Sequence, residues 1–88
     1  MTEREQVAEG FAHNLFKHRR RAGLTQQELA DRTGLHRTEI SLLETCRRIP
    51  RIDTLIKICD SLGVRPDQLL EEVEWLWDQQ RFLVGRIR

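Results

Sequence analysis

The chain has 88 residues, of which 39% are hydrophobic and 33% charged, and this suits one small domain with a single core. No segment approaches the roughly 20 consecutive apolar residues that a membrane span requires. The polar N-terminus lacks the apolar run of a secretory signal, so we expect a cytoplasmic protein. Cys46 and Cys59 have neither CxxC spacing nor a histidine pair beside them, which argues against a zinc site, and no cofactor is expected.

The net charge of +1 conceals an uneven distribution. Residues 1–51 contain ten Lys/Arg and seven Asp/Glu, whereas residues 52–88 contain five and seven. The positive charges collect at residues 17–21 and at Arg47, Arg48 and Arg51. Such clusters usually cover a solvated face. Here they flank two short predicted helices, which favours contact with nucleic-acid phosphates.

The sequence predicts an all-α fold, because sustained alternation of apolar and polar residues is absent. The first helix is expected over residues 5–22. The second begins after Thr25, which forms a capping box with Glu28 three residues later. The third begins after His36, a weaker cap, and Gly34 separates the two as a left-handed helix end.

The second and third helices are too short and too closely linked to lie antiparallel. We therefore expect them to cross steeply, as in a helix-turn-helix over residues 25–45. Ile40 and Leu43 should face the core. The residues expected to read base edges in the major groove lie on the opposite face of the third helix and are Arg37, Thr38, Ser41 and Leu42. In the alternative interpretation, this face only solvates an ordinary surface helix.

A fourth helix is expected after Pro50, and its predicted buried residues are Ile52, Leu55, Ile56, Cys59 and Leu62. A fifth helix should begin at Pro66, since proline suits the first helical position. No stop signal follows before Gly85. Residues 71–88 are therefore predicted to form a helical extension, with or without a kink near residues 71–74.

This extension is apolar on more than one face, which a chain this small can hardly cover by itself. We therefore predict a homodimer interface formed by Leu69, Val73, Leu76, Trp77 and Leu83. Two alternatives stay open, because the extension could fold back onto the first and fourth helices or bind a different protein. A two-fold dimer would place its recognition helices roughly 34–36 Å apart and favour a palindromic operator.

Many spaced residues resemble the Xre/Cro-CI family of helix-turn-helix regulators. The matching positions are residues 23–30 (GLTQQELA), Gly34, Ile40, Ser41, Leu43, Glu44, Pro50, residues 53–55 and residues 62–64. The resemblance implies a five-helix, lambda-repressor-like DNA-binding domain over residues 1–70, usually dimeric on operator DNA. Cys46 departs from the pattern, because glycine is usual at this position.

The resemblance also implies roles for individual residues. The phosphate contacts it implies are Thr25, Gln26, Arg47, Arg48 and Arg51. Arg19 and Glu44 match a pair of residues that form an ion pair between the first and third helices, with a structural role.

These observations predict a transcriptional regulator that binds double-stranded operator DNA as a homodimer. Enzyme activity is not expected, because the three histidines lie apart and form no catalytic constellation. Two other functions stay open. The chain could be the antitoxin of a toxin–antitoxin pair, with its C-terminal segment neutralising the toxin. It could also be a protein-interaction module without DNA binding, an idea that Leu42 and the low net charge support.

Overall fold

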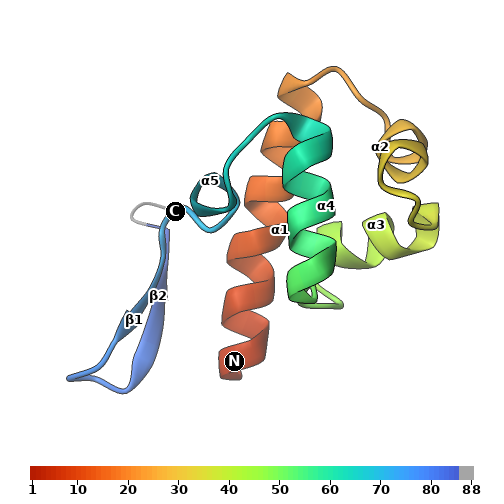
Figure 1. The fold of residues 1–88 in the computed structure, drawn as a ribbon. Coiled ribbons are helices and arrows are strands. Elements are labelled where there is room, and N and C mark those ends of the chain that lie inside the picture. Colours follow the sequence, from red (N-terminus) through yellow and green to blue (C-terminus); the bar gives the residue numbers. More distant parts are fainter. Residues whose placement is uncertain (86–88) are drawn as a thin grey trace.

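The computed structural model describes residues 1–85, which form five helices followed by a β-hairpin (Figure 1). The helices are α1 (Glu3–Arg21), α2 (Gln26–Thr33), α3 (Arg37–Glu44), α4 (Ile52–Leu62) and α5 (Pro66–Leu69). The strands are β1 (Val73–Leu76) and β2 (Arg81–Val84). Within residues 1–85, no helix is both long and apolar enough to cross a lipid bilayer.

Local hydrogen bonds explain where the first two helices begin. The Thr25 hydroxyl accepts a hydrogen bond from the Glu28 backbone N–H at 3.0 Å, and the Glu28 carboxylate accepts one from the Thr25 N–H at 2.8 Å. This is the capping box predicted from the sequence. Thr2 and Glu5 form a second capping box at the start of α1. Gly34 ends α2 with φ of 75°, in the left-handed region that glycine adopts without steric cost.

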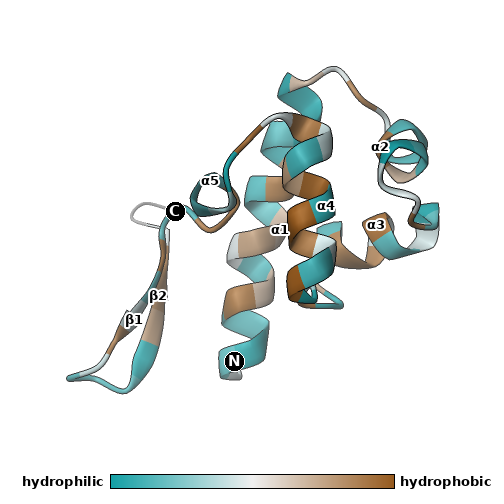
Figure 2. Ribbon diagram, in the orientation of Figure 1, coloured by the Kyte–Doolittle hydropathy of each residue, from teal (hydrophilic) through white to brown (hydrophobic). Residues whose placement is uncertain are grey.

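A single core lies between the five helices. Its fully buried large residues are Phe11, Leu15, Leu29, Ile40, Leu43, Ile58 and Leu69. Every helix contributes at least one of them, so the core holds the whole helical bundle together. Figure 2 shows brown, apolar segments on both α1 and α4.

The predicted buried face of α4 is partly wrong. Ile52 remains 77% exposed and Ile56 52% exposed, whereas Ile58 and Cys59 are buried. At 100° per residue, the Ile56 side chain points well away from the stripe that Ile58, Cys59 and the half-buried Leu62 form. The helix is apolar on two sides, and residues 1–85 cover only one of them.

The expected helical extension after residue 70 is wrong for the described residues, and so is the purely α-helical fold. β1 and β2 pair antiparallel, with Val73 opposite Val84 and Trp75 opposite Phe82. Leu69 is also unavailable to a dimer interface, because it ends α5 with an exposure of 0% in the core. Residues 86–88 of the predicted extension lie outside the described residues.

The hairpin folds back onto α1, on the side away from α2 and α3 (Figure 1). Gly10 permits this contact: a Cβ at this position would lie 2.6 Å from a Val73 methyl carbon and 2.8 Å from a Val84 methyl carbon. The Asn14 amide donates hydrogen bonds to the carbonyl oxygens of Leu69 at 3.0 Å and Glu71 at 2.9 Å. The start of the hairpin is therefore fixed to α1, while both strands carry further apolar residues along their length (Figure 2).

Candidate nucleic-acid interface

A buried network of polar groups joins α1, α2 and α3. The Arg19 guanidinium donates to both carboxylate oxygens of Glu44, at 2.6 and 2.9 Å. It also donates to the Leu24 carbonyl at 2.7 Å. The Gln26 amide donates to Glu44 at 3.1 Å. The Glu44 side chain is only 4% exposed and Arg19 8% exposed, so this network sets the position of α3 relative to the two helices before it.

The four predicted base-reading residues of α3 differ in their exposure. Arg37 and Thr38 are exposed, whereas Ser41 and Leu42 are half-buried. On the opposite face of α3, Ile40 and Leu43 each have an exposure of 0% and anchor the helix in the core. Arg37 makes no hydrogen bond or ion pair within residues 1–85, so its guanidinium is available to a ligand.

The start of α2 presents polar groups beside α3. Thr25 is exposed, and its hydroxyl oxygen accepts the capping hydrogen bond from the Glu28 N–H. The Glu28 carboxylate has its pKa lowered by the Thr25 backbone N–H and then by the Thr25 hydroxyl. Gln26 is half-buried because its amide is held by Glu44. The α2 start is therefore rigidly placed, with most of its polar groups already paired.

An open hollow of about 580 Å³ lies between the end of α1, the start of α2 and the start of α3. Its lining residues are Arg19, Arg20, Gly23, Leu24, Thr25, Gln26, Gln27 and Arg37. The set contains three arginines and no carboxylate. Arg20 is a candidate that the sequence analysis did not single out, although it belongs to the basic cluster noted at residues 17–21.

The loop from α3 to α4 carries the other predicted phosphate contacts. Arg48 pairs with Glu39 at 3.2 Å, and Arg51 pairs with Asp53 at 3.3 Å. Arg47 has no side-chain partner within residues 1–85 and is exposed. All three guanidinium groups lie at the surface, where solvent weakens ion pairs. Arg48 and Arg51 can therefore exchange their carboxylate partners for a phosphate at little cost, and Arg47 can bind a phosphate directly.

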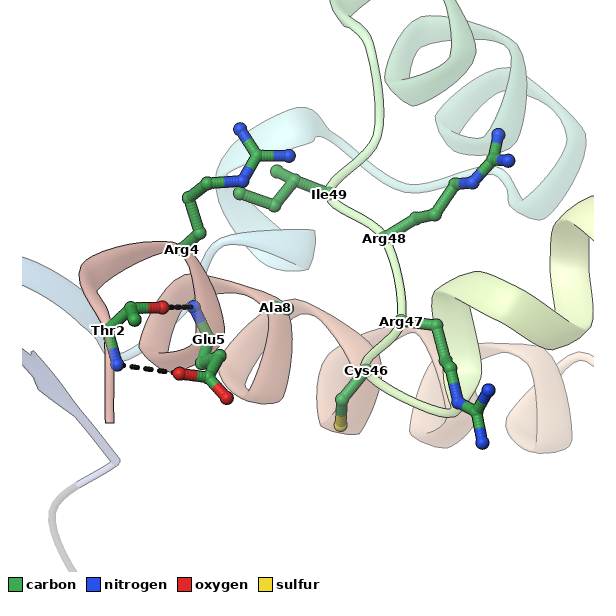
Figure 3. A pocket seen from close by; sticks show the side chains of 8 residues that line it. All are labelled: Thr2, Arg4, Glu5, Ala8, Cys46, Arg47, Arg48 and Ile49. Atoms are coloured by element: carbon green, nitrogen blue, oxygen red, sulfur yellow. Dashed lines mark hydrogen bonds between the residues drawn. The ribbon is translucent and has the colours of Figure 1, made fainter.

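A smaller pocket, of about 190 Å³, lies between this loop and the start of α1 (Figure 3). Arg4, Arg47 and Arg48 extend outward from this pocket, and Cys46 of the loop lines it together with Ala8 of α1. Cys46 adopts φ of 64°, in the region where glycine is favoured. Burial, and then the Glu9 carboxylate, raise the pKa of its thiol. Cys46 is therefore not an activated thiolate.

The described part of the chain offers no grouping of His, Cys, Asp or Glu that could hold a metal ion. The arrangement instead combines exposed arginines, hydroxyl groups and a helix that is fixed on one side and open on the other. These groups can donate hydrogen bonds to phosphates and base edges.

Comparison with known proteins places this arrangement in a family. The helix-turn-helix family HTH_3 matches residues 15–69, which include all five helices in part or in full. The chain is 41% identical over 61 residues to an uncharacterized HTH-type transcriptional regulator, YqaE, from Bacillus subtilis. That alignment spans 69% of this chain but only 53% of the relative, so the chain spans about half the length of YqaE.

Two solved structures share the fold. The hypothetical transcription factor NHTF from Neisseria has a TM-score of 0.71 and 31% sequence identity, covering 80% of each chain. The restriction-modification controller protein C.AhdI from Aeromonas hydrophila has a TM-score of 0.68 and 27% identity, covering 70% of this chain and 94% of its own. The HTH_3 match stops at residue 69, before the hairpin begins. The chain belongs to the HTH_3 family of DNA-binding helix-turn-helix transcriptional regulators, which is of the Xre/Cro-CI type.

Proposed function

We propose that this chain is a sequence-specific transcriptional regulator that inserts α3 into the major groove of double-stranded operator DNA. The observation that carries the proposal is the contrast between the two faces of α3. Ile40 and Leu43 are fully buried on one face, while Arg37 on the other is exposed and without a partner in residues 1–85. A helix held this way can present side chains to base edges without moving.

The proposed base contacts are Arg37, Thr38, Ser41 and Leu42. Arg37 suits bidentate contact with guanine, which contributes about 1–3 kcal/mol of discrimination. Because Leu42 is half-buried, it can offer only part of its surface to a thymine methyl group. The proposed phosphate contacts are Thr25, Gln26, Arg47, Arg48 and Arg51, and they set the position of α3 without reading sequence.

The experiment is a selection of bound duplexes from a random pool, followed by affinity measurements against salt concentration. Binding through several phosphates predicts a steep fall of log affinity with log salt, with a slope of about −0.9 per phosphate contact. Arg37→Ala should relax the sequence preference at one position, whereas Arg48→Ala should weaken all duplexes about equally. The proposal is contradicted if the chain selects no sequence from the pool, or if its affinity for DNA does not change with salt concentration.

We further propose that the regulator works as a homodimer assembled through the hairpin, with Leu76, Trp77 and Leu83 at the interface. Val73, which was also predicted there, packs against Gly10 of α1 on the opposite face of the hairpin. Trp77 is 77% exposed and Trp75 is 42% exposed. Large apolar side chains that face water in this way are typical of an interaction surface. The hairpin lies on the side of α1 away from α3, so its use leaves both recognition helices uncovered (Figure 1). A dimer with both α3 helices on one face of the duplex would select a palindromic operator.

Sedimentation experiments test this assembly. Trp77→Ala should shift the chain from dimer to monomer, and Ile56→Asn serves as a matched control because Ile56 is exposed on α4. Dimers that survive Trp77→Ala but not Ile56→Asn would place the interface on α4 instead. A wild-type chain that is monomeric at every concentration would contradict the homodimer and leave the hairpin for a different protein.

A further inference from the structure

An exposed aromatic residue on α1 holds an arginine beside the hollow described above. Phe16 is 47% exposed although it lies on a helix that buries its other two large apolar residues, Phe11 and Leu15, completely. The Arg20 guanidinium carbon lies 5.5 Å from the centre of the Phe16 ring, and that of Arg19 lies 5.3 Å from it. Both distances are within the range of a cation–π interaction. Phe16 therefore acts as a platform for two guanidinium groups.

The two guanidinium groups differ in what else they bind. Arg19 is fully used by Glu44 and the Leu24 carbonyl. Arg20 is exposed and makes no hydrogen bond or ion pair within residues 1–85. The Arg20 guanidinium therefore lies over the Phe16 ring, while its N–H donors have no partner within residues 1–85 and can bind a ligand. Exposure of an aromatic side chain to water is unfavourable, and the contact with Arg20 gives the exposed Phe16 ring a role.

The hollow that Arg20 lines has an uncompensated positive charge. Arg37 contributes a second guanidinium from α3, and it too lacks a partner within residues 1–85. The positive charge of Arg19 is matched by Glu44, so it does not enter this balance. Thr25, Gln26 and Gln27 add neutral polar groups, and no carboxylate from residues 1–85 lines the hollow. A hollow with two free guanidinium groups and no acid suits an anion with several acceptor oxygens.

We propose that Arg20 contacts a backbone phosphate of bound DNA in this hollow, and that Phe16 is its positioning residue. The inference rests on the proposed function, because Arg37 belongs both to the hollow and to the base-reading face of α3. A phosphodiester is favoured over a free anion for this reason: an occupant of the hollow lies next to the helix that reads the duplex. The contact extends the DNA interface onto α1, beyond the two helices of the helix-turn-helix.

Affinity against salt, measured with the selected duplex and with an unrelated duplex, tests the contact. Arg20→Gln should reduce the magnitude of the log–log slope by about 1 and weaken both duplexes to the same extent. Arg20→Lys should restore the slope. Arg21→Gln is the matched control, because Arg21 is exposed on the neighbouring position of α1, loses the same charge and does not line the hollow. The slope for Arg21→Gln should stay close to that of the wild-type chain.

The role of Phe16 needs a separate readout. Phe16→Leu removes the ring but keeps the charge of Arg20, so the salt slope should persist while affinity falls roughly two- to five-fold. On the Arg20→Gln background, the same change should cause no further loss, because the platform then has nothing to position. If Phe16→Leu lowers the affinity by the same factor in the wild-type chain and in the Arg20→Gln chain, Phe16 does not act through Arg20.

The outcomes separate the two proposals. If the wild-type chain binds DNA with a steep salt slope and Arg20→Gln leaves that slope unchanged, the regulator stands and the Arg20 contact is overturned. The contact is also overturned if Arg20→Gln and Arg21→Gln reduce the slope equally, because then only the general charge of α1 matters. If the wild-type chain shows no salt-dependent DNA binding, both proposals are overturned.

Discussion

Arg19 of α1 and Glu44 of α3 form a bidentate ion pair whose two N–O distances are 2.6 and 2.9 Å. The pair makes two further hydrogen bonds, because Arg19 also donates to the Leu24 carbonyl and Glu44 also accepts from the Gln26 amide. Buried ion pairs offset their desolvation cost only when such additional hydrogen bonds are present. The pair therefore fixes one orientation of α3, which a purely apolar contact would specify less sharply.

Removing one partner should be strongly destabilising. Arg19→Ala leaves the Glu44 carboxylate, which is 4% exposed, without its counter-charge, and we expect a loss of about 3–5 kcal/mol in the free energy of unfolding. Denaturant unfolding followed by circular dichroism measures this loss. Arg21→Ala, at an exposed position of the same helix, should change the free energy by less than about 0.5 kcal/mol. A loss below about 1 kcal/mol for Arg19→Ala would contradict the assignment.

Replacement of Gly10 should loosen the hairpin although it favours the helix. Alanine in a helix interior is more stable than glycine by about 0.5–1 kcal/mol. Here the new Cβ would meet Val73 at 2.6 Å and Val84 at 2.8 Å, and overpacking of this kind costs about 1–3 kcal/mol. We expect Gly10→Ala to be destabilising overall and to change the fluorescence of Trp75 and Trp77. Adding Val73→Ala removes the closer of the two contacts and should restore part of both properties, while the contact with Val84 remains. A stabilised Gly10→Ala chain would show that the hairpin is not docked here.

The helical bundle could be predicted because its signals are local. The capping box of Thr25 and Glu28, the glycine at position 34 and the proline at position 66 each act on the backbone beside them. The hairpin could not be predicted from the same kind of signal. In the turn of residues 77–80, Gln80 adopts φ of 52° although it is neither glycine nor asparagine, and the sequence lacks the Asn-Gly or Asp-Gly pair that marks a tight hairpin. Leu69, Leu76 and Leu83 are spaced seven residues apart, which is also the spacing of an apolar stripe on a helix, and this spacing led to the wrong prediction of a helical extension.

A signal for the strands was nevertheless present. Val73, Trp75, Phe82 and Val84 are β-branched or aromatic residues, which are enriched in strands, and Val73 and Trp75 alternate with Glu74 and Leu76. At the proposed site, the position of Arg37 followed from helical periodicity. The proposed phosphate contact of Arg20 could not be predicted in the same way, because it depends on the Phe16 ring and on a hollow formed by three helices.

Cys46 stands in a backbone conformation that suits glycine. Its φ of 64° costs a residue with a Cβ roughly 1–2 kcal/mol. Cys46→Gly should relieve this strain, although glycine also gains entropy in the unfolded chain, so we expect a net stabilisation of about 0.5–1 kcal/mol. Thermal unfolding measures the change. Thr45→Gly is the control: Thr45 has φ of −101°, and the same substitution there should destabilise the chain.

His18 should make stability depend on pH in a defined window. Its Nε2 atom is buried without a hydrogen-bond partner in residues 1–85. Burial first, and then the positive charges of Lys17 and Arg21, lower the pKa of His18 below 6.5, while the Glu71 carboxylate and the Gln68 backbone act in the opposite direction. Protonation therefore favours the unfolded state. The stability that neutral His18 contributes is fully present above about pH 6.5 and is lost as the pH falls from there through the lower pKa of the folded state.

Unfolding free energies between about pH 7 and pH 5 should thus decrease as the pH falls. This window lies above the range in which Glu5, Glu28 and Asp67 contribute, because the pKa of each of these carboxyl groups is lowered on folding, from 4.5, 4.5 and 3.8 respectively. His18→Gln removes the titrating ring and should flatten the dependence. His13→Gln, at an exposed position of α1, should retain it. If the decrease is the same in the wild-type chain and in His18→Gln, another group is responsible and the contact between α1 and α5 does not sense protons.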